Sequence, residues 1–321
     1  MHEYKPLLQI VKRQKANGTW GDNILGADPG RGRLLPDGGT IARYCRLVEF
    51  GLPPGERVFR LTERVFFRLL SRDDAPELLY EFKKAGKADG RVAAWIRTRM
   101  REGAAAALAQ GGLVDDPRVR GAAHRVASDV SQFLRSELSD KPYMRKGNRT
   151  IVHPDAYPPT WFSVATLAFM PSLQRERAGF VERLATFLAR PAGKRIGVMP
   201  VGNRFYKPTH ELFGDPLHVD AAGRTSDIPL ALAWIEILTR LGMLHTSETA
   251  QRALLRLLKE CDDRGVWSPK GLRSLPKCPS NLAGFAFPLE PDGKTAERRQ
   301  ADVTFRLALI AKLAGWQLTY A

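Results

Sequence analysis

Apolar residues recur every three to four positions along most of the chain, and this spacing is typical of amphipathic helices. One such run covers residues 58–69, with arginines between the apolar positions, and another covers residues 119–134. Asp115-Asp116-Pro117 precedes the second run. This favours a helix start, because the free N–H groups of a first turn attract negative charge and proline needs no donor there. Convincing runs with a period of two are absent, so the pattern predicts an all-α protein.

The predicted helices alternate between an outer and an inner set. Near the N-terminus an amphipathic helix ends at Asn17-Gly18 and is followed by Trp20, and near the other end a similar helix ends at Arg264-Gly265 before Trp267. Glycine allows the left-handed cap that ends a helix, and the tryptophan then folds back onto its hairpin. A longer, more apolar helix follows each turn, so we expect a repeat of helical hairpins. The inner helices are expected at 39–51, 90–110, 157–171, 227–243 and 301–316, and the outer helices at 4–15, 56–71, 116–138, 174–190 and 247–261.

The string Gln14-Lys15-Ala16-Asn17-Gly18-Thr19-Trp20, followed by Gly39-Thr40-Ile41, resembles the helical-hairpin repeats of squalene–hopene cyclases and protein prenyltransferases. Residues 112–119 also resemble the outer-helix openings of that family. The resemblance implies an α/α toroid, in which inner helices line a central cavity and outer helices cover them. An open solenoid of the HEAT type remains the alternative. We expect one domain, 1–321, of about five hairpins, with long loops at 16–38, 139–156, 191–226 and 264–300.

The chain is strongly basic, with 50 Lys and Arg against 34 Asp and Glu and a net charge of +16. A charge of this size suggests a polyanionic partner, most often nucleic acid. Three cysteines form no disulfide framework, the N-terminal residues lack the apolar core of a signal peptide, and no apolar run is long enough to cross a membrane. These features predict a cytoplasmic protein that binds DNA and has no membrane span.

The catalytic motifs of the resembling families are not found in this chain. Asp262-Asp263 is the best match to the acid of triterpene cyclases, but it lies in a repeat turn. Cys261 and Cys278 have no nearby Asp-x-Cys spacing of the kind that a prenyltransferase zinc site needs. Residues 210–220 hold two His and two Asp that could surround a divalent ion, although their spacing matches no zinc pattern. We expect no metal or cofactor and leave this loop as an open alternative.

Basic and aromatic residues gather near the expected starts of the inner helices, where a toroid would bring them to one mouth of the cavity. The loop at 141–150 adds four basic residues and no acid, and Gly147 would let its backbone approach a phosphate. Arginine binds phosphates and aromatic rings stack on bases, so these residues predict a nucleic-acid surface. The candidates are Arg43, Tyr44, Arg97, Lys141, Arg145, Lys146, Arg149, Trp161, Arg298, Arg299 and Arg306.

A closed cavity with a basic rim predicts a DNA-binding enzyme that takes one flipped nucleotide inside. Without a metal, a lone carboxylate suits N-glycosidic cleavage, so we expect a DNA glycosylase that removes damaged or modified bases in repair or defence. Asp302 is the first candidate, with Arg306 one turn away as an ion-pair partner, and Asp227 is the second. The alternative for both aspartates is that they only cap their helices.

Two other classes of function stay open at this stage. The first is a terpene-cyclase-like or prenyltransferase-like enzyme that acts on an isoprenoid diphosphate, and the second is a non-catalytic nucleic-acid-binding scaffold. The lining of the cavity would discriminate between the enzyme classes. A polar, cationic wall favours nucleotide chemistry, whereas an aromatic wall without charges favours a polyisoprenoid.

Overall fold

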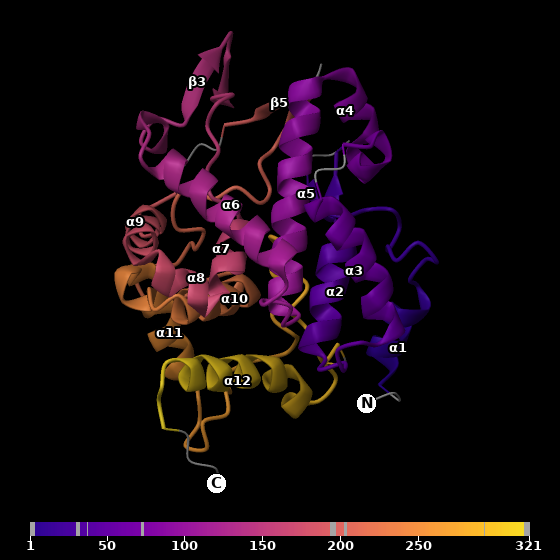
Figure 1. Ribbon diagram of the computed structural model, residues 1–321. Helices are drawn as coiled ribbons and strands as arrows, with labels where there is room; N and C mark the ends of the chain where they lie inside the picture. The colour runs from indigo at the N-terminus through magenta and orange to yellow at the C-terminus, as the bar shows by residue number, and fades with distance from the viewer. Residues whose placement is uncertain are drawn as a thin grey trace.

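Helices form 53% of the chain, so the prediction of a mostly helical protein is confirmed. The computed structural model describes residues 4–29, 33–36, 38–71, 74–192, 197–201, 204–291 and 293–317. The helices expected to be inner are α2 (Thr40–Glu49), α5 (Gly90–Gln110), α7 (Trp161–Ala168), α10 (Ile228–Arg240) and α12 (Ala296–Leu313) (Figure 1). The helices expected to be outer are α1 (Lys5–Lys12), α3 (Arg57–Leu70), α6 (Pro117–Leu134), α8 (Pro171–Glu176), α9 (Ala178–Leu188) and α11 (Glu248–Leu258).

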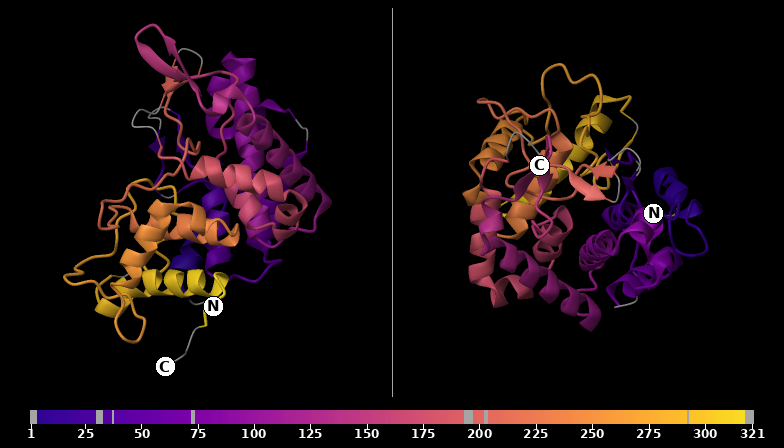
Figure 2. Two further views of the ribbon diagram at one scale, coloured as in Figure 1. Left: turned by 90° about the vertical axis from the view of Figure 1, so that its left-hand side faces the viewer. Right: turned by 90° about the horizontal axis from the view of Figure 1, so that it is seen from above.

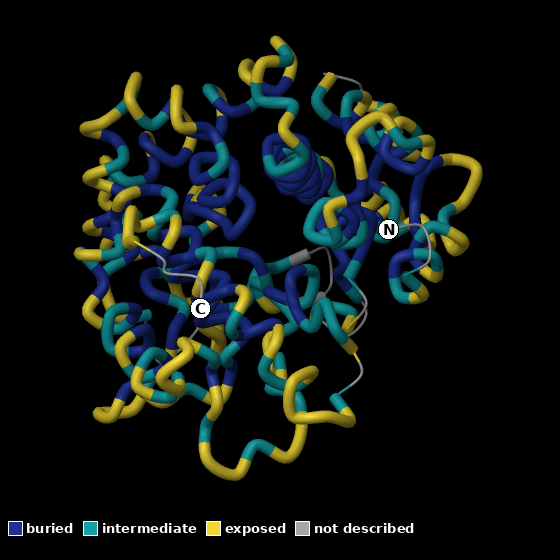
Figure 3. Tube along the Cα trace, turned by 90° about the horizontal axis from the view of Figure 1, so that it is seen from below, coloured by how far each residue is buried: buried dark blue, intermediate teal, exposed yellow. Residues whose placement is uncertain are grey.

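The inner helices pack side by side in chain order. Helix α2 packs on α5, α5 on α7, α7 on α10, and α10 on α12. All residues of α7 are buried, and α5 is buried from Gly103 to Ala109 because small side chains there allow close packing. At Gly103 a Cβ atom would lie 2.4 Å from Cδ1 of Ile41, so any larger residue there would displace the end of that side chain. Buried segments gather in the interior and exposed ones lie mainly around the outside (Figure 3).

The two Gly-Trp turns have one hydrogen bond in common, to a threonine hydroxyl, although they lie near opposite ends of the chain. The backbone N–H of Trp20 donates to Thr40 Oγ1, and that of Trp267 donates to Thr304 Oγ1, both at 3.1 Å. Gly18 and Gly265 have φ values of 84° and 76°, which a side chain would strain. Each indole also bonds to its own hairpin: Trp20 Nε1 donates to the carbonyl of Ile10, and Trp267 Nε1 to Glu260. The predicted packing of both tryptophans is therefore confirmed.

Short strands interrupt the segments that were expected to be loops, and here the sequence prediction was wrong. Within the described ranges they form three antiparallel hairpins. Their strands are β1 (Ala27–Asp28) with β2 (Arg33–Leu34), β3 (Tyr143–Lys146) with β4 (Arg149–Val152), and β5 (Met199–Val201) with β6 (Arg204–Tyr206). A period of two appears only where one face of a strand is buried. The tip of the β3–β4 hairpin is exposed on both faces, so it lacks that period.

The remaining elements connect these helices. A 3-10 helix (Pro76–Phe82) and α4 (Lys83–Ala88) lead into α5, and two further 3-10 turns lie at Glu137–Ser139 and Leu244–Thr246. The β3–β4 hairpin and α12 lie at opposite ends of the molecule (Figures 1 and 2). Among the described residues, no helix is both long enough and apolar enough to cross a bilayer.

Candidate functional site: a cavity among the inner helices

A cavity lies among the inner helices, and the centre of a water molecule can reach about 70 Å³ of it. Side chains from α2, α5, α7, α10 and α12 line it, together with residues of the segments 25–38 and 281–286. Aromatic rings form much of the wall: Trp161, Phe162, Phe169 and Phe285. Trp161 packs on Trp234 with the ring centroids 5.9 Å apart, which keeps its ring against the cavity. The cavity is therefore largely apolar.

A buried group of charges interrupts this apolar wall. The guanidinium of Arg306 on α12 donates to Glu236 Oε2 on α10 at 2.8 Å and to Glu49 Oε2 at the end of α2 at 2.5 Å. Gln110 Nε2 of α5 donates to the other oxygen of Glu49 at 2.7 Å. Arg240, outside the cavity lining, pairs with Glu236 at 2.9 Å. We call Glu49, Glu236 and Arg306 the ion triad; it joins α2 to α10 and α12.

Burial raises the pKa of Glu49 above its ordinary value, and the positive charge of Arg306 opposes that shift. Two carboxylates share one guanidinium, so protonation of Glu49 leaves Glu236 paired with it. Glu49 is therefore protonated more readily than an exposed glutamate. Both of its carboxylates and its arginine line the cavity.

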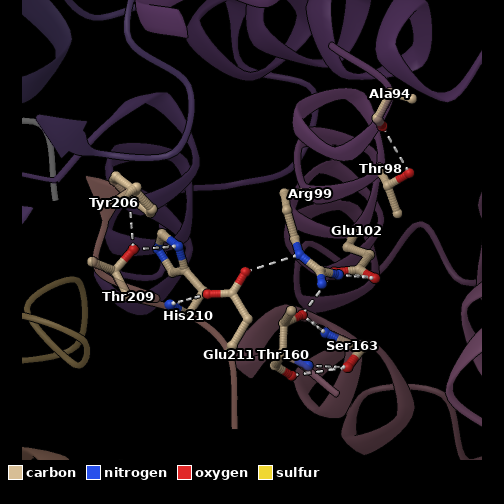
Figure 4. Close-up of polar contacts among 10 residues, drawn as sticks. All are labelled: Ala94, Thr98, Arg99, Glu102, Thr160, Ser163, Tyr206, Thr209, His210 and Glu211. Atoms are coloured by element: carbon tan, nitrogen blue, oxygen red, sulfur yellow. Dashed lines mark hydrogen bonds and ion pairs between the residues drawn. The ribbon is translucent and has the colours of Figure 1, made fainter. Parts of the chain in front are cut away.

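A second buried ion cluster lies beside the cavity (Figure 4). Arg99 of α5 pairs with Glu102 at 2.9 Å and with Glu211 at 3.2 Å. Thr160, the N-cap residue of α7, donates its hydroxyl proton to Glu102 at 2.8 Å and also caps the helix with Ser163. These contacts hold the segment around Glu211 against the start of α7. The preceding residue, His210, is thereby placed at the cavity wall.

The ring of His210 stacks on Phe162 with the centroids 4.5 Å apart and lines the cavity. Its Nδ1 lies 3.2 Å from Thr209 Oγ1, which in turn lies 2.7 Å from the hydroxyl of Tyr206 (Figure 4). Burial, with a smaller effect of the Arg99 charge, lowers the pKa of His210 to about 3. The ring is therefore neutral at physiological pH and serves as a hydrogen-bonding group of the wall.

The lowered pKa of His210 makes the stability of the protein depend on pH. Between pH 6.5 and 3 this histidine is protonated in the unfolded chain but not in the folded chain. Its contribution to the free energy of unfolding is therefore fully present above pH 6.5 and decreases as the pH falls. Lowering the pH from 7 to 5 should reduce the free energy of unfolding by about 2 kcal/mol through this residue alone. Urea denaturation at both pH values should show that loss in the wild type and about 2 kcal/mol less of it in His210→Gln. An equal loss in both proteins would contradict the prediction.

The two predicted catalytic aspartates lie outside the cavity lining. Asp302 was expected at the start of its helix and paired with Arg306; α12 instead begins at Ala296, with Thr295 as its N-cap residue, and Arg306 belongs to the ion triad. The Asp302 carboxylate accepts the backbone N–H groups of Leu289, at 2.9 Å, and Glu290. It therefore anchors the segment that precedes α12.

Asp227 is the N-cap residue of α10, where its carboxylate accepts the backbone N–H groups of Leu230 and Ser280, each at 3.0 Å. Asp262 likewise accepts two backbone N–H groups within its turn, those of Arg264 and Val266. The carboxylates of Asp302, Asp227 and Asp262 therefore all accept hydrogen bonds from backbone N–H groups. The capping alternative describes Asp227 well.

The predicted nucleic-acid residues do not converge on one mouth. Lys141, Arg145, Lys146 and Arg149 lie on or beside the β3–β4 hairpin, whereas Arg298 and Arg299 begin α12 at the opposite end of the molecule (Figure 1). The inner helices do not share one direction: in Figure 1, α5 runs along the height of the molecule, whereas α12 runs across it.

Several of these candidates also have other contacts. Tyr44 is buried and donates to Glu63, Arg306 is buried in the ion triad, and Trp161 lines the cavity. Arg97 pairs with Asp74. Arg43 lies on α2, and Arg299 donates to the backbone carbonyls of Leu272, Gly293 and Lys294. The exposed candidates that remain together are those of the β3–β4 hairpin.

The histidines and aspartates of residues 210–220 point to different partners. Asp215 accepts the hydroxyl of Ser247 and the N–H of Leu217, and Asp220 accepts two N–H groups of its own turn. His218 is exposed, and His210 faces the cavity. In the part of the chain that the structure describes, no three His, Cys, Asp or Glu side chains lie close enough to hold a metal ion.

No family model, curated protein or solved structure matches this chain. The resemblance to cyclase and prenyltransferase repeats therefore remains a prediction from the residues.

Glu49 and His210 were missed as cavity residues, and Glu236 was not singled out within its predicted inner helix. The signal for Glu236 and Arg306 is that each is a lone charge within an apolar stretch of an inner helix. A buried charge needs a partner, so two such charges on neighbouring inner helices indicate an ion pair. No comparable signal marks His210, because its place depends on the Arg99–Glu211 contact.

Proposed function

We propose that the chain is an enzyme that binds a neutral, isoprenoid-like molecule in the cavity and transfers protons to and from it with Glu49 and Glu236. We propose further that the inner helices close into an α/α toroid around this cavity. The contact between Arg306 of α12 and Glu49 of α2 supports closure, because it joins the last inner helix to the first. An open solenoid would leave these two helices apart.

The main support for the proposal is that Arg306, which lines the cavity, is already paired with two carboxylates. A flipped nucleotide or a diphosphate brings negative charge, which needs a free arginine or another unpaired donor when it is buried. The wall offers aromatic and aliphatic side chains instead, and these bind apolar surface. The cavity therefore favours the small-molecule class over the DNA glycosylase, and a neutral ligand over the isoprenoid diphosphate.

The chemistry follows from the position of the Glu49 carboxyl group at the cavity wall, where burial raises its pKa. When this carboxylate takes up a proton, the resulting acid can give it to a carbon–carbon double bond of the bound molecule. The resulting carbocation lies among aromatic rings, whose faces attract positive charge. The carbocation then loses a proton from a neighbouring carbon, and a carboxylate of the triad accepts it. The net change is migration of the double bond to a neighbouring position, with one proton given and one taken back. No metal or cofactor takes part in these steps.

Competition with an uncharged fluorescent probe, N-phenyl-1-naphthylamine, tests which ligands the cavity accepts. We expect farnesol to displace the probe at a concentration at least tenfold lower than farnesyl diphosphate or deoxyadenosine monophosphate. The reason is that burying a phosphate beside the paired triad carries an uncompensated desolvation cost. Stronger displacement by either phosphate compound would contradict the proposal.

Two variants show whether the probe binds in this cavity. Ala233 lines the cavity from α10, so Ala233→Phe should fill it and weaken farnesol binding at least tenfold. Leu255→Phe adds an aromatic ring at an exposed position of α11 and should leave binding unchanged. Thermal unfolding followed by circular dichroism confirms that both variants are folded. Equal binding by Ala233→Phe and the wild type would place the ligand elsewhere.

A further inference from the structure

The β3–β4 hairpin projects from the end of the molecule opposite α12 (Figures 1 and 2). Its strands pair in register from Tyr143 with Val152 to Lys146 with Arg149, and Gly147-Asn148 forms the turn. Gly147 has a φ of 58°, as the first turn residue of a two-residue hairpin often requires. Residues 144–150 are all exposed, so both faces of the ribbon stand in solvent. A strand that packed on the body would bury every second side chain.

A second hairpin braces the projecting one. Val198, just before β5, bonds to the backbone of β4, and the guanidinium of Arg149 lies 4.1 Å from the ring centroid of Phe205 in β6. The ring centroid of Tyr206 in β6 lies 5.9 Å from those of Phe82, the N-cap residue of α4, and Trp95 of α5. The two hairpins and α4 therefore form one continuous end of the molecule.

This end carries exposed basic side chains with little opposing charge. Among the described residues, none of them forms an ion pair, and residues 141–152 contain no acid. Asp89 lies between α4 and α5, and its carboxylate caps α5 by accepting the N–H groups of Arg91 and Val92. We call the following set the basic end: Lys83, Lys84, Lys87, Arg91, Lys141, Arg145, Lys146, Arg149 and Lys207.

We propose that the basic end is a docking surface for duplex DNA, with the β3–β4 hairpin inserted in a groove. A two-stranded ribbon fits the major groove, where side chains on both of its faces reach base edges and phosphates. Arg145, Lys146 and Arg149 supply cations along the ribbon, and Asn148 at the tip can both donate and accept hydrogen bonds. This function is separate from that of the cavity, because no residue of the basic end lines it.

The composition of the tip favours DNA over an anionic membrane. Insertion into a bilayer needs apolar side chains at the most exposed point. Here that point is Lys146-Gly147-Asn148-Arg149, whereas the exposed Met144 lies further back along β3. A ribbon with a polar, basic tip suits the grooves of a duplex.

Fluorescence anisotropy with a labelled 20-base-pair duplex tests the proposal on the full chain. Replacement of Arg145, Lys146 and Arg149 together by Gln should weaken binding at least tenfold near 0.1 M salt. It should also reduce the slope of log affinity against log salt by about 2–3, because each lost phosphate contact releases one counterion fewer. The matched control replaces Arg57, Arg60 and Arg64 on α3 by Gln, which removes the same charge from exposed positions away from this end.

The control variant should bind the duplex within threefold of the wild type. Equal weakening in both triple variants would overturn the proposal, because binding would then depend on net charge alone. Absence of binding at low salt would also overturn it, as would wild-type binding to vesicles with 30% phosphatidylserine in the absence of DNA binding. Farnesol binding should be the same in all three proteins, so failure here is distinguishable from failure of the cavity proposal.

Discussion

Arg306→Met is expected to lower the free energy of unfolding by about 3–5 kcal/mol, since it leaves two buried carboxylates without their shared cation. Arg306 is 3% exposed, and its side chain joins α12 to α2 and α10. Gln110 and Arg240 still contact the carboxylates, but neither replaces the guanidinium between them. Urea denaturation at neutral pH measures the loss.

A rescue variant separates the buried charge from the packing of the side chain. Arg306→Met combined with Glu49→Gln and Glu236→Gln removes the unpaired carboxylates and should restore most of the stability, because neutral side chains of similar size can replace buried ion pairs. The exposed pair of Arg118 with Asp116 provides the control, and Arg118→Met should cost less than about 1 kcal/mol. A loss in the triple variant as large as that in Arg306→Met would show that packing, not charge, is responsible.

Glu49→Gln is expected to reduce proton transfer to a bound polyene by 10²- to 10⁴-fold, the range typical of a general acid. The glutamine keeps the size of the side chain and its contact with Gln110 but has no acidic proton. Incubation of farnesol with the protein in D₂O should add deuterium at a carbon of a double bond, and mass spectrometry follows its rate.

Binding and chemistry should separate in this variant. Farnesol should bind Glu49→Gln within threefold of the wild type, because the apolar wall is unchanged. Asp302→Asn serves as the comparison, since Asp302 anchors backbone outside the cavity, and it should keep the wild-type rate. An unchanged rate in Glu49→Gln together with a loss in Asp302→Asn would return the catalytic assignment to the sequence candidate.

Much of the helical fold could be predicted from the sequence because buried helices carry a strong periodic signal. Helix α5 has the bounds expected for it, 90–110, and α2, α3 and α10 differ from the expected ranges by a few residues. The Gly-Trp turns could be found because glycine at positive φ and a buried indole are both restricted to few residue types. The hairpins were missed because short strands with two exposed faces have no periodic pattern.

The candidate site was harder to predict because it depends on contacts between distant segments. Glu49 and Arg306 are separated by 257 positions, and nothing local indicates that they meet. Asp302 stood out as an acid near a helix start, yet its carboxylate is taken up by the backbone of the preceding segment. An acid on an inner helix can cap, anchor or pair, and only the three-dimensional arrangement decides among these roles.

Photocrosslinking of a bound ligand tests the central claim most directly, because it locates the ligand on the chain. A benzophenone ether of farnesol, irradiated with the protein and followed by proteolysis and mass spectrometry, should label peptides that contain Trp161 and Phe285. Unlabelled farnesol should suppress this labelling, and Ala233→Phe should abolish it. Labelling confined to peptides outside the cavity lining, or labelling that farnesol does not suppress, would contradict the claim that the inner helices enclose a site for an apolar molecule.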